Sequence, residues 1–501
     1  DGLSISAMNP AGPLLLAGGG HSHALILKRW AMDPTRRPAR PVVLINRGST
    51  ALYSGMVPAL IAGIDPPEAA AIDLRSLCDR AGVAFIQAEI TGLDPIQRCL
   101  ALAERPPLRF GVLSLNVGAI SRPTAEGMAI KPLEPALAFI ASEDPHSTNP
   151  FTVVGSGAAA TEAVLALRRR WPHRPLRLQA RPDGLGTLEQ RILFNASIDL
   201  ITSSEPVVGP RLLCTGSRAP HWLAASGLLV DGDGRLRTNA QLQVEGNEHV
   251  FASGDCAVMA AAPRPASGVW AVRAAIPLAR NLEASCLDRP LRPWRPQREA
   301  LQLIGDQQGR AWARRGRWQL GPSRWLWQWK RRIDRRFMAG FRSSKPMTAS
   351  EPMACRGCAA KLPAQPLEAA LDQAGLSGPP EDAARIEGDP PLLQSVDGFP
   401  ALVSDPWLNG RLTTLHACSD LWASGARVDS AQAIVTLPVL EAAEQQELLV
   451  QTLCGVRSVL EEQQAQLIGG HTLESRSEPP HCPGLGVQLS LCVNGRSASP
   501  W

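Results

Sequence analysis

Short apolar runs alternate with glycine turns and helical patterns in the N-terminal half of the chain. The first run, Leu14–Ala17, precedes Gly18-Gly19-Gly20-His21-Ser22-His23, and the apolar stretch Ala24–Leu27 follows. This order predicts a buried strand, a tight turn and a helix, the start of a dinucleotide-binding fold. Gly18 permits the sharp turn, and Gly20 lets a pyrophosphate approach the backbone at the helix N-terminus. For this motif alone, an ordinary strand-to-helix turn is the alternative.

A second unit of the same kind supports the dinucleotide-binding interpretation. The strand Phe151–Val154 leads into a G-x-G-x-x-A turn with Gly155 and Gly157, and Glu162 lies just inside the following helix. Two such units predict two nested Rossmann-like domains, each with its own cofactor. The next strand ends at Arg181 without an acid, which favours NADPH over NADH because arginine can meet a 2′-phosphate.

Three further positions bear on these two domains. His23 occupies the place of the third glycine, and Asn46 stands where an acid usually ends the second strand. An amide there can still bond a ribose hydroxyl. A later apolar strand ends at Asp255, whose carboxylate can accept a hydrogen bond from a sugar-like hydroxyl. Taken alone, that last feature would be a simple strand-ending turn.

Composition narrows the class of protein. The chain has 501 residues, 45% hydrophobic and 19% charged, so it is long enough for several domains and is not a disordered chain. No run of ~18 apolar residues predicts a transmembrane helix, and the net charge of +5 is too small to indicate nucleic acid. The 11 scattered cysteines indicate a reducing compartment, the cytoplasm. Because the sequence begins at Asp1 and stops at Trp501, just after an expected strand, we expect a fragment.

The order of the motifs GGGHSH, YSGMVP, GSGAAATE and VFASGDCA resembles the FAD-dependent pyridine nucleotide–disulfide oxidoreductase superfamily, most closely the type II NADH dehydrogenase branch. The resemblance implies a fold of two nested α/β domains that bind FAD and NAD(P)H. It implies FAD contacts at Gly18, Gly20 and Asp255, and it assigns Gly155, Gly157 and Glu162 to the NAD(P)H domain. Because the first domain has no C-x4-C pair, we expect electrons to pass directly from nicotinamide to flavin.

Residues 310–345 form a basic stretch with 12 Lys and Arg residues and a single acid, Asp334. Five tryptophans lie within it, and apolar residues recur at helical spacing between 325 and 342. A basic, tryptophan-bearing amphipathic helix can lie on an anionic membrane surface. The alternative, which we favour, is a helix packed on its own flavin domain with a solvated arginine face.

A different pattern begins after a linker at 346–353. Cys355-Arg356-Gly357-Cys358-Ala359-Ala360-Lys361 lacks the second cysteine pair of a structural zinc site. Cys358, three residues before Lys361, is better explained as a nucleophile whose thiolate the lysine favours. Acids follow at Asp382, at Asp397, expected at a strand end, and at Asp420, expected in a helix. We expect a glycine turn after the strand that leads to Gly469, and acids near such a turn suit Mg²⁺ and nucleotide phosphates.

The series CxxCxxK, EDAA, SVDGF, SDLWASGA and GGHT resembles selenophosphate synthetase (selenide, water dikinase), of the aminoimidazole ribonucleotide synthetase-like ATP-binding family. The reaction of that family converts selenide, ATP and water to selenophosphate, AMP and phosphate. The resemblance implies a homodimer formed through this domain. It implies catalytic roles for Cys358 and Lys361, Mg²⁺ ligands at Asp382 and Asp420, and ATP contacts at Asp397, Gly469, Gly470 and His471.

The sequence therefore predicts an enzyme with two modules, a flavoprotein and the first half of a selenophosphate synthetase with an α+β fold. The expected domains are FAD-binding at 10–150 and 236–345, NAD(P)-binding at 151–235, and ATP-binding at 354–497. The alternative enzyme is an NAD(P)H:quinone oxidoreductase with an inactive dimerisation domain. A non-enzymatic alternative is a flavoprotein peripheral to the membrane whose C-terminal half serves only for dimerisation. The expected partners are small molecules, without nucleic acid, and the location is cytoplasmic or at the membrane surface.

Overall fold

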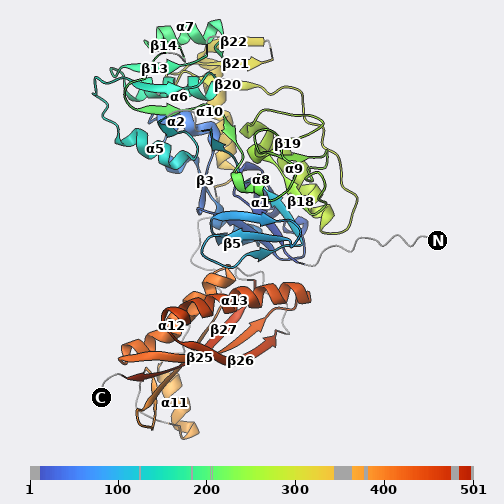
Figure 1. Ribbon diagram of the computed structural model, residues 1–501, viewed down its shortest axis with the longest axis vertical. Coiled ribbons are helices and arrows are strands. Elements are labelled where there is room, and N and C mark those ends of the chain that lie inside the picture. Colours follow the sequence, from blue (N-terminus) through green and yellow to red (C-terminus); the bar gives the residue numbers. More distant parts are fainter. Residues whose placement is uncertain are drawn as a thin grey trace, which may run out of the picture.

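The computed structural model describes residues 12–122, 126–181, 184–202, 205, 207–316, 318–342, 364–376, 382–475 and 485–497. Figure 1 shows an upper part built from the N-terminal two thirds of the chain and a separate C-terminal module below it. Within the described ranges, no helix has the length and apolar character needed to cross a bilayer.

The first sheet is parallel and carries the first glycine turn. Its strand order is β18-β9-β1-β2-β5, and every residue of β1 is buried, because neighbouring strands and covering helices enclose it. This burial on both faces explains the continuous apolar run at 14–17. The strands are β1 Leu14–Ala17, β2 Val42–Asn46, β5 Ala84–Gln87, β9 Val112–Leu115 and β18 Val250–Ala252, and the main helices are α1 His21–Met32, α4 Leu74–Ala81 and α9 Gly268–Ser285.

Smaller elements surround this sheet. They are β3 Thr50–Leu52, η2 Ser54–Met56, α2 Val57–Ile61, α3 Pro67–Ala70, β4 Ala71–Asp73, the antiparallel β6 Ile90–Asp94, β7 Cys99–Leu102 and β8 Leu108–Arg109, α8 His221–Ala225, β17 Leu236–Thr238, η4 Gly254–Cys256 and β19 Ala257–Met259.

The second sheet is also parallel, in the order β11-β15-β12-β13-β14. The two parallel sheets confirm the predicted pair of nested Rossmann-like domains. The second domain begins before residue 151, because β11 and α5 belong to it, and the chain returns to the first domain where β16 pairs with β10. The elements are β10 Ile120–Ser121, β11 Met128–Ala129, α5 Leu133–Ser142, β12 Phe151–Val154, α6 Ala158–Arg170, β13 Leu176–Gln179, α7 Thr187–Asn195, β14 Asp199–Ile201, β15 Arg211–Leu213 and β16 Ser217–Arg218.

A three-stranded antiparallel sheet and a long helix complete the upper part. The sheet consists of β20 Gln302–Gly305, β21 Ala311–Arg315 and β22 Trp318–Ser323, and α10 Arg324–Ala339 follows directly. Ile304 and Trp312 are buried in the core of the second domain, although we had expected this segment in the FAD-binding domain. Trp312 packs there because a fully buried indole removes a large apolar surface from water.

The C-terminal module has one mixed sheet, in the order β23-β24-β27-β25-β26, and confirms the expected α+β domain. Helices α12 and α13 pack together and against the sheet. Side chains on the opposite sheet face are exposed, among them Val396 and Ile434. The elements are α11 Ala364–Ala374, β23 Ala384–Ile386, β24 Leu392–Pro400, α12 Pro406–Ala423, β25 Ala426–Leu437, α13 Ala442–Glu462, β26 Gln466–Glu474 and β27 Gln488–Ser497.

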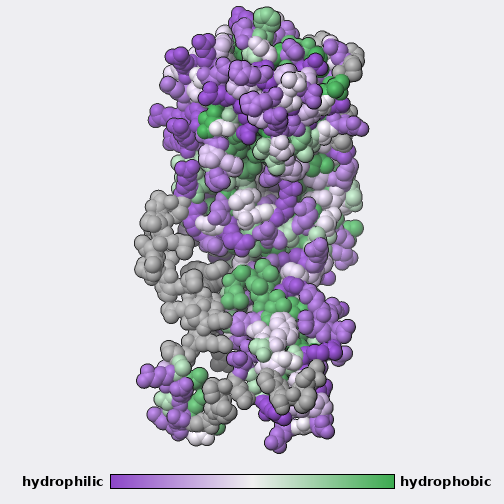
Figure 2. All heavy atoms as spheres, turned by 90° about the vertical axis from the view of Figure 1, so that its left-hand side faces the viewer, coloured by the Kyte–Doolittle hydropathy of each residue, from purple (hydrophilic) through white to green (hydrophobic). Residues whose placement is uncertain are grey.

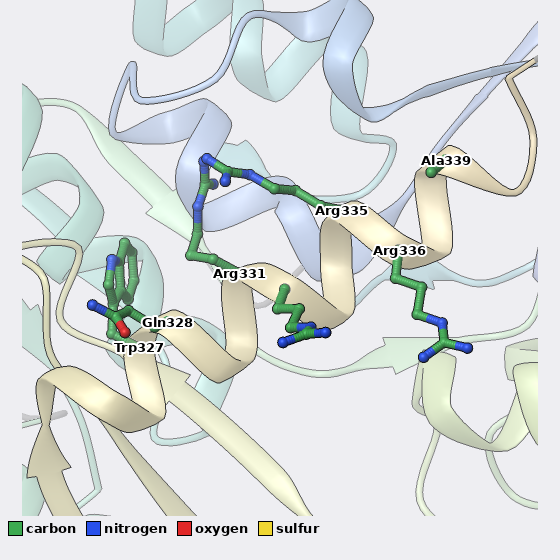
Figure 3. Close-up of a pocket in the computed structure, with 7 residues that line it drawn as sticks. Trp327, Gln328, Arg331, Arg335, Arg336 and Ala339 are labelled. Atoms are coloured by element: carbon green, nitrogen blue, oxygen red, sulfur yellow. The ribbon is translucent and has the colours of Figure 1, made fainter.

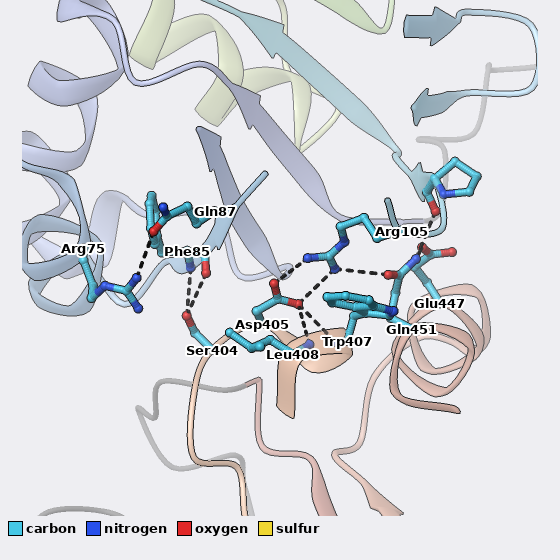
Figure 4. A network of polar contacts seen from close by, with 11 residues as sticks. Arg75, Phe85, Gln87, Arg105, Ser404, Asp405, Trp407, Leu408, Glu447 and Gln451 are labelled. Atoms are coloured by element: carbon cyan, nitrogen blue, oxygen red, sulfur yellow. Dashed lines mark hydrogen bonds and ion pairs between the residues drawn. The ribbon is translucent and has the colours of Figure 1, made fainter. Parts of the chain in front are cut away.

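A buried polar network joins the two modules (Figure 4). The Arg105 guanidinium donates to Asp405, with Nη2 2.9 Å from Oδ1, and the two side chains are 4% and 6% exposed. Ser404 Oγ accepts a hydrogen bond from the Phe85 backbone N–H at 2.9 Å, and the Gln451 amide donates to the Pro107 carbonyl at 3.0 Å. Because each group would cost free energy if buried alone, the network fixes the register of the contact.

Apolar packing surrounds these polar contacts. The seam includes Leu15 and Val43, at the amino ends of β1 and β2, together with Leu448 of α13. Leu485 packs against the cores of both modules. Figure 2 shows hydrophobic side chains gathered at the level where the modules meet. The junction therefore lies where the strands of the first sheet begin, at the opposite end from their carboxyl ends.

Candidate cofactor and active sites

The first glycine turn lies at the carboxyl end of β1. Gly18 has φ +90°, and an added Cβ would lie 2.6 Å from the Asn116 carbonyl oxygen, so only glycine fits. A Cβ at Gly20 would overlap the side chain of Asn116. The Asn116 amide in turn donates to the Ser253 carbonyl at 2.8 Å and accepts from the Ser22 backbone N–H at 3.2 Å. This asparagine, which sequence reasoning missed, ties the turn to the segment that carries Asp255.

His23 explains why the third glycine of the motif is dispensable. Its ring is completely buried, with Nδ1 2.7 Å from the Gly18 carbonyl oxygen and Nε2 2.8 Å from Ser114 Oγ. Because a carbonyl only accepts, Nδ1 carries the proton and Nε2 accepts from the serine hydroxyl. Burial lowers the pKa of His23 to about 4, so the ring is neutral at physiological pH. The imidazole thus links the helix to the sheet where the usual motif has close glycine packing.

Asn46 does not present a free amide as the sequence suggested. Its Oδ1 accepts a hydrogen bond from the Gly19 backbone N–H at 2.9 Å, and its Nδ2 donates to the Gly48 carbonyl at 2.7 Å. The oxygen of the amide therefore holds the glycine turn, and its nitrogen holds the loop that follows β2. An aspartate at this position could not make the second contact, because a carboxylate has no donor.

Asp255 has one occupied and one open carboxylate oxygen. Its Oδ2 lies 2.7 Å from Nζ of Lys131, which belongs to the second domain, whereas Oδ1 is buried without a hydrogen-bond partner among the described residues. A buried acceptor of this kind requires a donor, and a ribityl hydroxyl would supply one. Together with the glycine turn at Gly18 and Gly20, this orphaned oxygen fits FAD.

The second glycine turn resembles the first, because its first position also has room only for glycine. Gly155 has φ +149°, and an added Cβ would lie 2.5 Å from the Cys214 carbonyl oxygen, whereas a Cβ at Gly157 would meet nothing within 4 Å. Open space therefore lies beside Gly157, where a pyrophosphate would approach. The Arg181 backbone N–H donates to Ser156 Oγ at 2.8 Å, which places this exposed arginine beside the turn. These residues fit a nicotinamide dinucleotide.

Glu162 faces α10 rather than open space. Its Oε1 accepts from the Gly305 backbone N–H at 3.0 Å and lies 3.8 Å from Nζ of Lys330. Lys330 also lies 3.9 Å from Asp334, which accepts a hydrogen bond from the Tyr53 hydroxyl at 3.2 Å. Burial raises the pKa of both Glu162 and Asp334, and the lysine counteracts this effect. This buried cluster joins both cofactor domains to α10.

Sequence reasoning missed this cluster, although two signals pointed to it. Lys330 is one of few lysines in a chain dominated by arginine, and Tyr53 is its single tyrosine. Tyr53 stacks on Phe337 of α10 with ring centroids 4.3 Å apart, and His21 packs edge-on against the same tyrosine. Lys330 lies 168 residues from Glu162, and Asp334 lies 281 residues from Tyr53, so the cluster gives no local pattern.

The C-terminal module places the three predicted acids in three separate settings. Asp397 lies inside β24 rather than at a strand end, so that expectation is wrong, and its Oδ2 is 2.9 Å from His416 Nδ1. Asp420 Oδ2 accepts a hydrogen bond from Ser395 Oγ at 2.7 Å, and Asp382 is exposed. Within the described ranges, no three His, Cys, Asp or Glu side chains gather closely enough to hold a metal ion. The described residues do not assemble a Mg²⁺ site, and we derive no step through this ion.

The expected glycine turn is also wrong. Gly469, Gly470 and His471 lie within β26, an edge strand, and all three are exposed. The ladder shifts register between Ala431 and Gln432 of β25, opposite the glycines. Cys358, Lys361 and the linker 346–353 lie outside the described residues.

Comparison with known proteins separates the two modules. Residues 380–493 match the family model "AIR synthase related protein, N-terminal domain". Selenide, water dikinase from Nitratidesulfovibrio vulgaris (strain DP4) is 38% identical over 99 residues, 19% of this chain and 28% of the relative. Ferroptosis suppressor protein 1 from Taeniopygia guttata is 24% identical over 316 residues, 56% of this chain and 81% of that protein. The chain therefore spans under a third of the dikinase's length.

Solved structures share the fold of the upper part. The sulfide:quinone oxidoreductase from Aquifex aeolicus superposes with a TM-score of 0.56 at 15% identity, covering 74% of this chain and 96% of that one. A NAD-dependent persulfide reductase from A. fulgidus superposes with a TM-score of 0.51 at 13% identity, covering 60% and 63%. The upper part thus shares the fold of these oxidoreductases, and the C-terminal module is similar to the AIR synthase-related model over residues 380–493.

Proposed function

We propose that the chain is an FAD-dependent NAD(P)H oxidoreductase joined to the N-terminal, ATP-binding part of a selenophosphate synthetase. The observation that carries the first half is the buried, unpartnered Oδ1 of Asp255 beside the turn of Gly18 and Gly20. FAD would supply the redox chemistry when bound, and the protein would hold it and exclude competing reactions. Purified protein should show flavin absorbance, which Asp255→Ala should weaken. A colourless wild-type protein, gently purified, would contradict this proposal.

Direct electron transfer from nicotinamide is the second part of the proposal. No two described cysteines form a disulfide, and burial raises the pKa of Cys78 and of Cys214, so neither is a ready thiolate. NADPH is the expected donor because Arg181 lies beside the second glycine turn. Anaerobic bleaching of the flavin should survive Cys78→Ser and Cys99→Ser. If bleaching is lost in these variants while flavin remains bound, a cysteine relay is required.

The selenophosphate synthetase activity rests on the C-terminal similarity. Selenide and ATP are the proposed substrates, with ATP near Asp397 and residues 469–471, and catalysis by Cys358 and Lys361. Mg²⁺ at Asp382 and Asp420 belongs to the proposal only with nucleotide phosphates as further ligands, because the described residues alone do not assemble the site. Cys358→Ser in a full-length protein should abolish selenide-dependent AMP formation and leave flavin bleaching intact. Cys355→Ser is the matched control and should be milder. Normal selenophosphate formation by the Cys358 variant would contradict the assignment.

Homodimerisation through the C-terminal sheet is part of the same proposal. Val396, Ile434 and Ile468 are 68%, 50% and 58% exposed, and β26 leaves one edge of the sheet open. Exposed apolar side chains on a sheet face with an open edge favour association with a second copy. Sedimentation should show a dimer that Ile434→Asp dissociates. The absence of disulfides among the described cysteines supports a reducing, cytoplasmic location.

A further inference from the structure

An ion pair crosses from one cofactor domain to the other beside the first glycine turn. Nζ of Lys131 lies 2.7 Å from Asp255 Oδ2, and the two side chains are 35% and 16% exposed. Burial lowers the pKa of His21, the first residue of α1, and the charge of Asp255 raises this pKa whereas that of Lys131 lowers it. The pair therefore lies close to the residue that follows Gly20, within the site proposed for FAD.

Backbone hydrogen bonds fix each partner on its own domain. Asp255 follows β18, and the Ser253 N–H just before it donates to the Leu115 carbonyl at 3.0 Å within the first sheet. Lys131 follows β11, and its N–H donates to Ser121 Oγ of β10 at 3.1 Å. Strands β10 and β16 pair where the chain passes between the domains. The distance from Nζ to Oδ2 therefore depends on how the second domain is placed on the first.

A lysine leaves half of the Asp255 carboxylate available. Its ammonium group is a compact charge that pairs with Oδ2, and Oδ1 stays buried without a hydrogen-bond partner among the described residues. An arginine would offer a planar fork that takes both oxygens of a carboxylate. Lysine is uncommon in this chain, where five of the 51 basic residues are lysines and the rest are arginines. The residue type at 131 thus suits a carboxylate that has a second hydrogen bond to accept.

Two arginine pairs in the same chain show the difference. Arg331 of α10 donates to both carboxylate oxygens of Asp65, with Nη2 2.8 Å from Oδ1. Arg105 likewise donates to both oxygens of Asp405. Figure 3 shows the Arg331 side chain extending from α10. The Arg331 pair is 15% and 14% exposed, and both oxygens of its aspartate are used, so Arg331 is a matched control for Lys131.

We propose that Lys131 is a positioning residue for FAD, an inference that rests on the proposed flavoprotein function. From the second domain it holds Oδ2 of Asp255, so that Oδ1 is kept in place to accept a hydrogen bond from a ribityl hydroxyl. Without the lysine, the carboxylate is free to rotate about its Cβ–Cγ bond, and ordering it adds to the cost of binding the cofactor. By linkage, bound FAD in turn stabilises the contact between the two domains.

The test uses the whole chain with its FAD and obtains the dissociation constant from the flavin fluorescence released on dilution. Lys131→Met should weaken FAD binding about 10-fold, because a charge-assisted hydrogen bond no longer orients Asp255. Lys131→Arg should weaken binding to a similar degree, because its fork competes for Oδ1, whereas a merely structural ion pair would be restored by arginine. Arg331→Met should change the affinity less than about twofold, because this arginine lies outside the site. Circular dichroism confirms that each variant is folded.

A double variant and hydrogen exchange separate positioning from direct contact. Lys131→Met should add no further loss of FAD affinity to Asp255→Ala, because the lysine acts through the carboxylate. Saturation with FAD should slow amide exchange at β10 and β16 in the wild type and slow it less in Lys131→Met. The proposal is overturned by additive losses in the double variant, by wild-type affinity in Lys131→Arg, or by an equal loss in Arg331→Met. A wild-type protein that binds no FAD contradicts the proposed function itself, and this inference falls with it.

Discussion

Arg105 and Asp405 lie 300 residues apart in the chain and form a buried ion pair across the boundary of the two modules. The same guanidinium stacks over Trp407, 5.0 Å from the ring centroid, and reaches Gln451 at 3.3 Å. Asp405 also begins α12, where its carboxylate accepts from the Trp407 backbone N–H at 3.1 Å. One aspartate therefore caps a helix and holds a partner module.

Loss of this aspartate should uncouple the modules. Asp405→Ala leaves Arg105 buried without its counter-charge and should cost ~3–5 kcal/mol of unfolding free energy. Asp429→Ala, which breaks the exposed pair with Arg496, is the control and should cost under ~1 kcal/mol. Asp405→Asn retains the oxygen that caps α12 but removes the charge. Its smaller loss of unfolding free energy therefore measures the contribution of the charge. Denaturant unfolding followed at both modules checks this; equal losses in Asp405→Ala and Asp429→Ala would show that the junction contributes nothing.

The buried His23 should make folding sensitive to acid. Its pKa is about 4 in the folded protein against 6.5 when unfolded, so the unfolded state binds the proton first. The stabilisation is complete above pH 6.5 and is lost as the pH falls toward 4, by about 3 kcal/mol at most. His23→Gln should flatten this part of the stability–pH curve, while His146→Gln at an exposed site should not. An unchanged slope in His23→Gln would contradict the assignment.

Removal of Lys330 should destabilise the protein more at neutral pH than in acid. Lys330→Met leaves Glu162 and Asp334 buried without their cation, which raises the pKa of both carboxyls further. A raised folded pKa means that stability is lost as the pH rises above the unfolded value, near 4.5 for glutamate. The loss should reach about 3 kcal/mol at neutral pH and be smaller in acid. Lys28→Met, which removes a contact with Phe341, should show no such pH dependence; a pH-independent loss in Lys330→Met would argue against the cluster.

The two glycines of β26 should behave differently. A Cβ at Gly470 would overlap the Ala433 carbonyl oxygen, so Gly470→Ala should lower the melting temperature of the C-terminal module. A Cβ at Gly469 would meet nothing within 4 Å, so Gly469→Ala should leave stability unchanged. If Gly469 contacts ATP, the added methyl should weaken nucleotide binding at an unchanged melting temperature. Calorimetric titration with ATP checks this, and unaltered affinity would remove Gly469 from the proposed site.

The parallel sheets could be predicted from the sequence because their strands are buried on both faces and appear as continuous apolar runs. β1 at Leu14–Ala17 and β12 at Phe151–Val154 have the predicted bounds. β26 misled the same reasoning, because its residues are exposed and its glycines resemble a turn. A strand can be predicted from the sequence when its residues are buried and its side chains follow a regular pattern. An exposed edge strand that contains glycine has neither feature.

The sites could be predicted only in part, because they depend on contacts between residues far apart in the sequence. The turn residues Gly18 and Gly20 follow from a local motif, but Asn116, which completes the turn, lies 94 residues beyond Ser22. The sequence shows that His23 occupies the place of the third glycine, but its role depends on Ser114 of a neighbouring strand. The ion pair of Lys131 with Asp255 likewise depends on how the second domain returns to the first.

The position of the junction has an evolutionary consequence. The modules adhere through the amino ends of β1 and β2, whereas the glycine turn and Asp255 lie at the opposite, carboxyl edge of that sheet. In α12, Asp405 lies at the junction, and Asp420 lies near the far end of this 18-residue helix. A contact in this position leaves the proposed cofactor turn and Asp420 away from the surface that the two modules share. Substitutions in that shared surface could therefore accumulate during evolution without touching either proposed site.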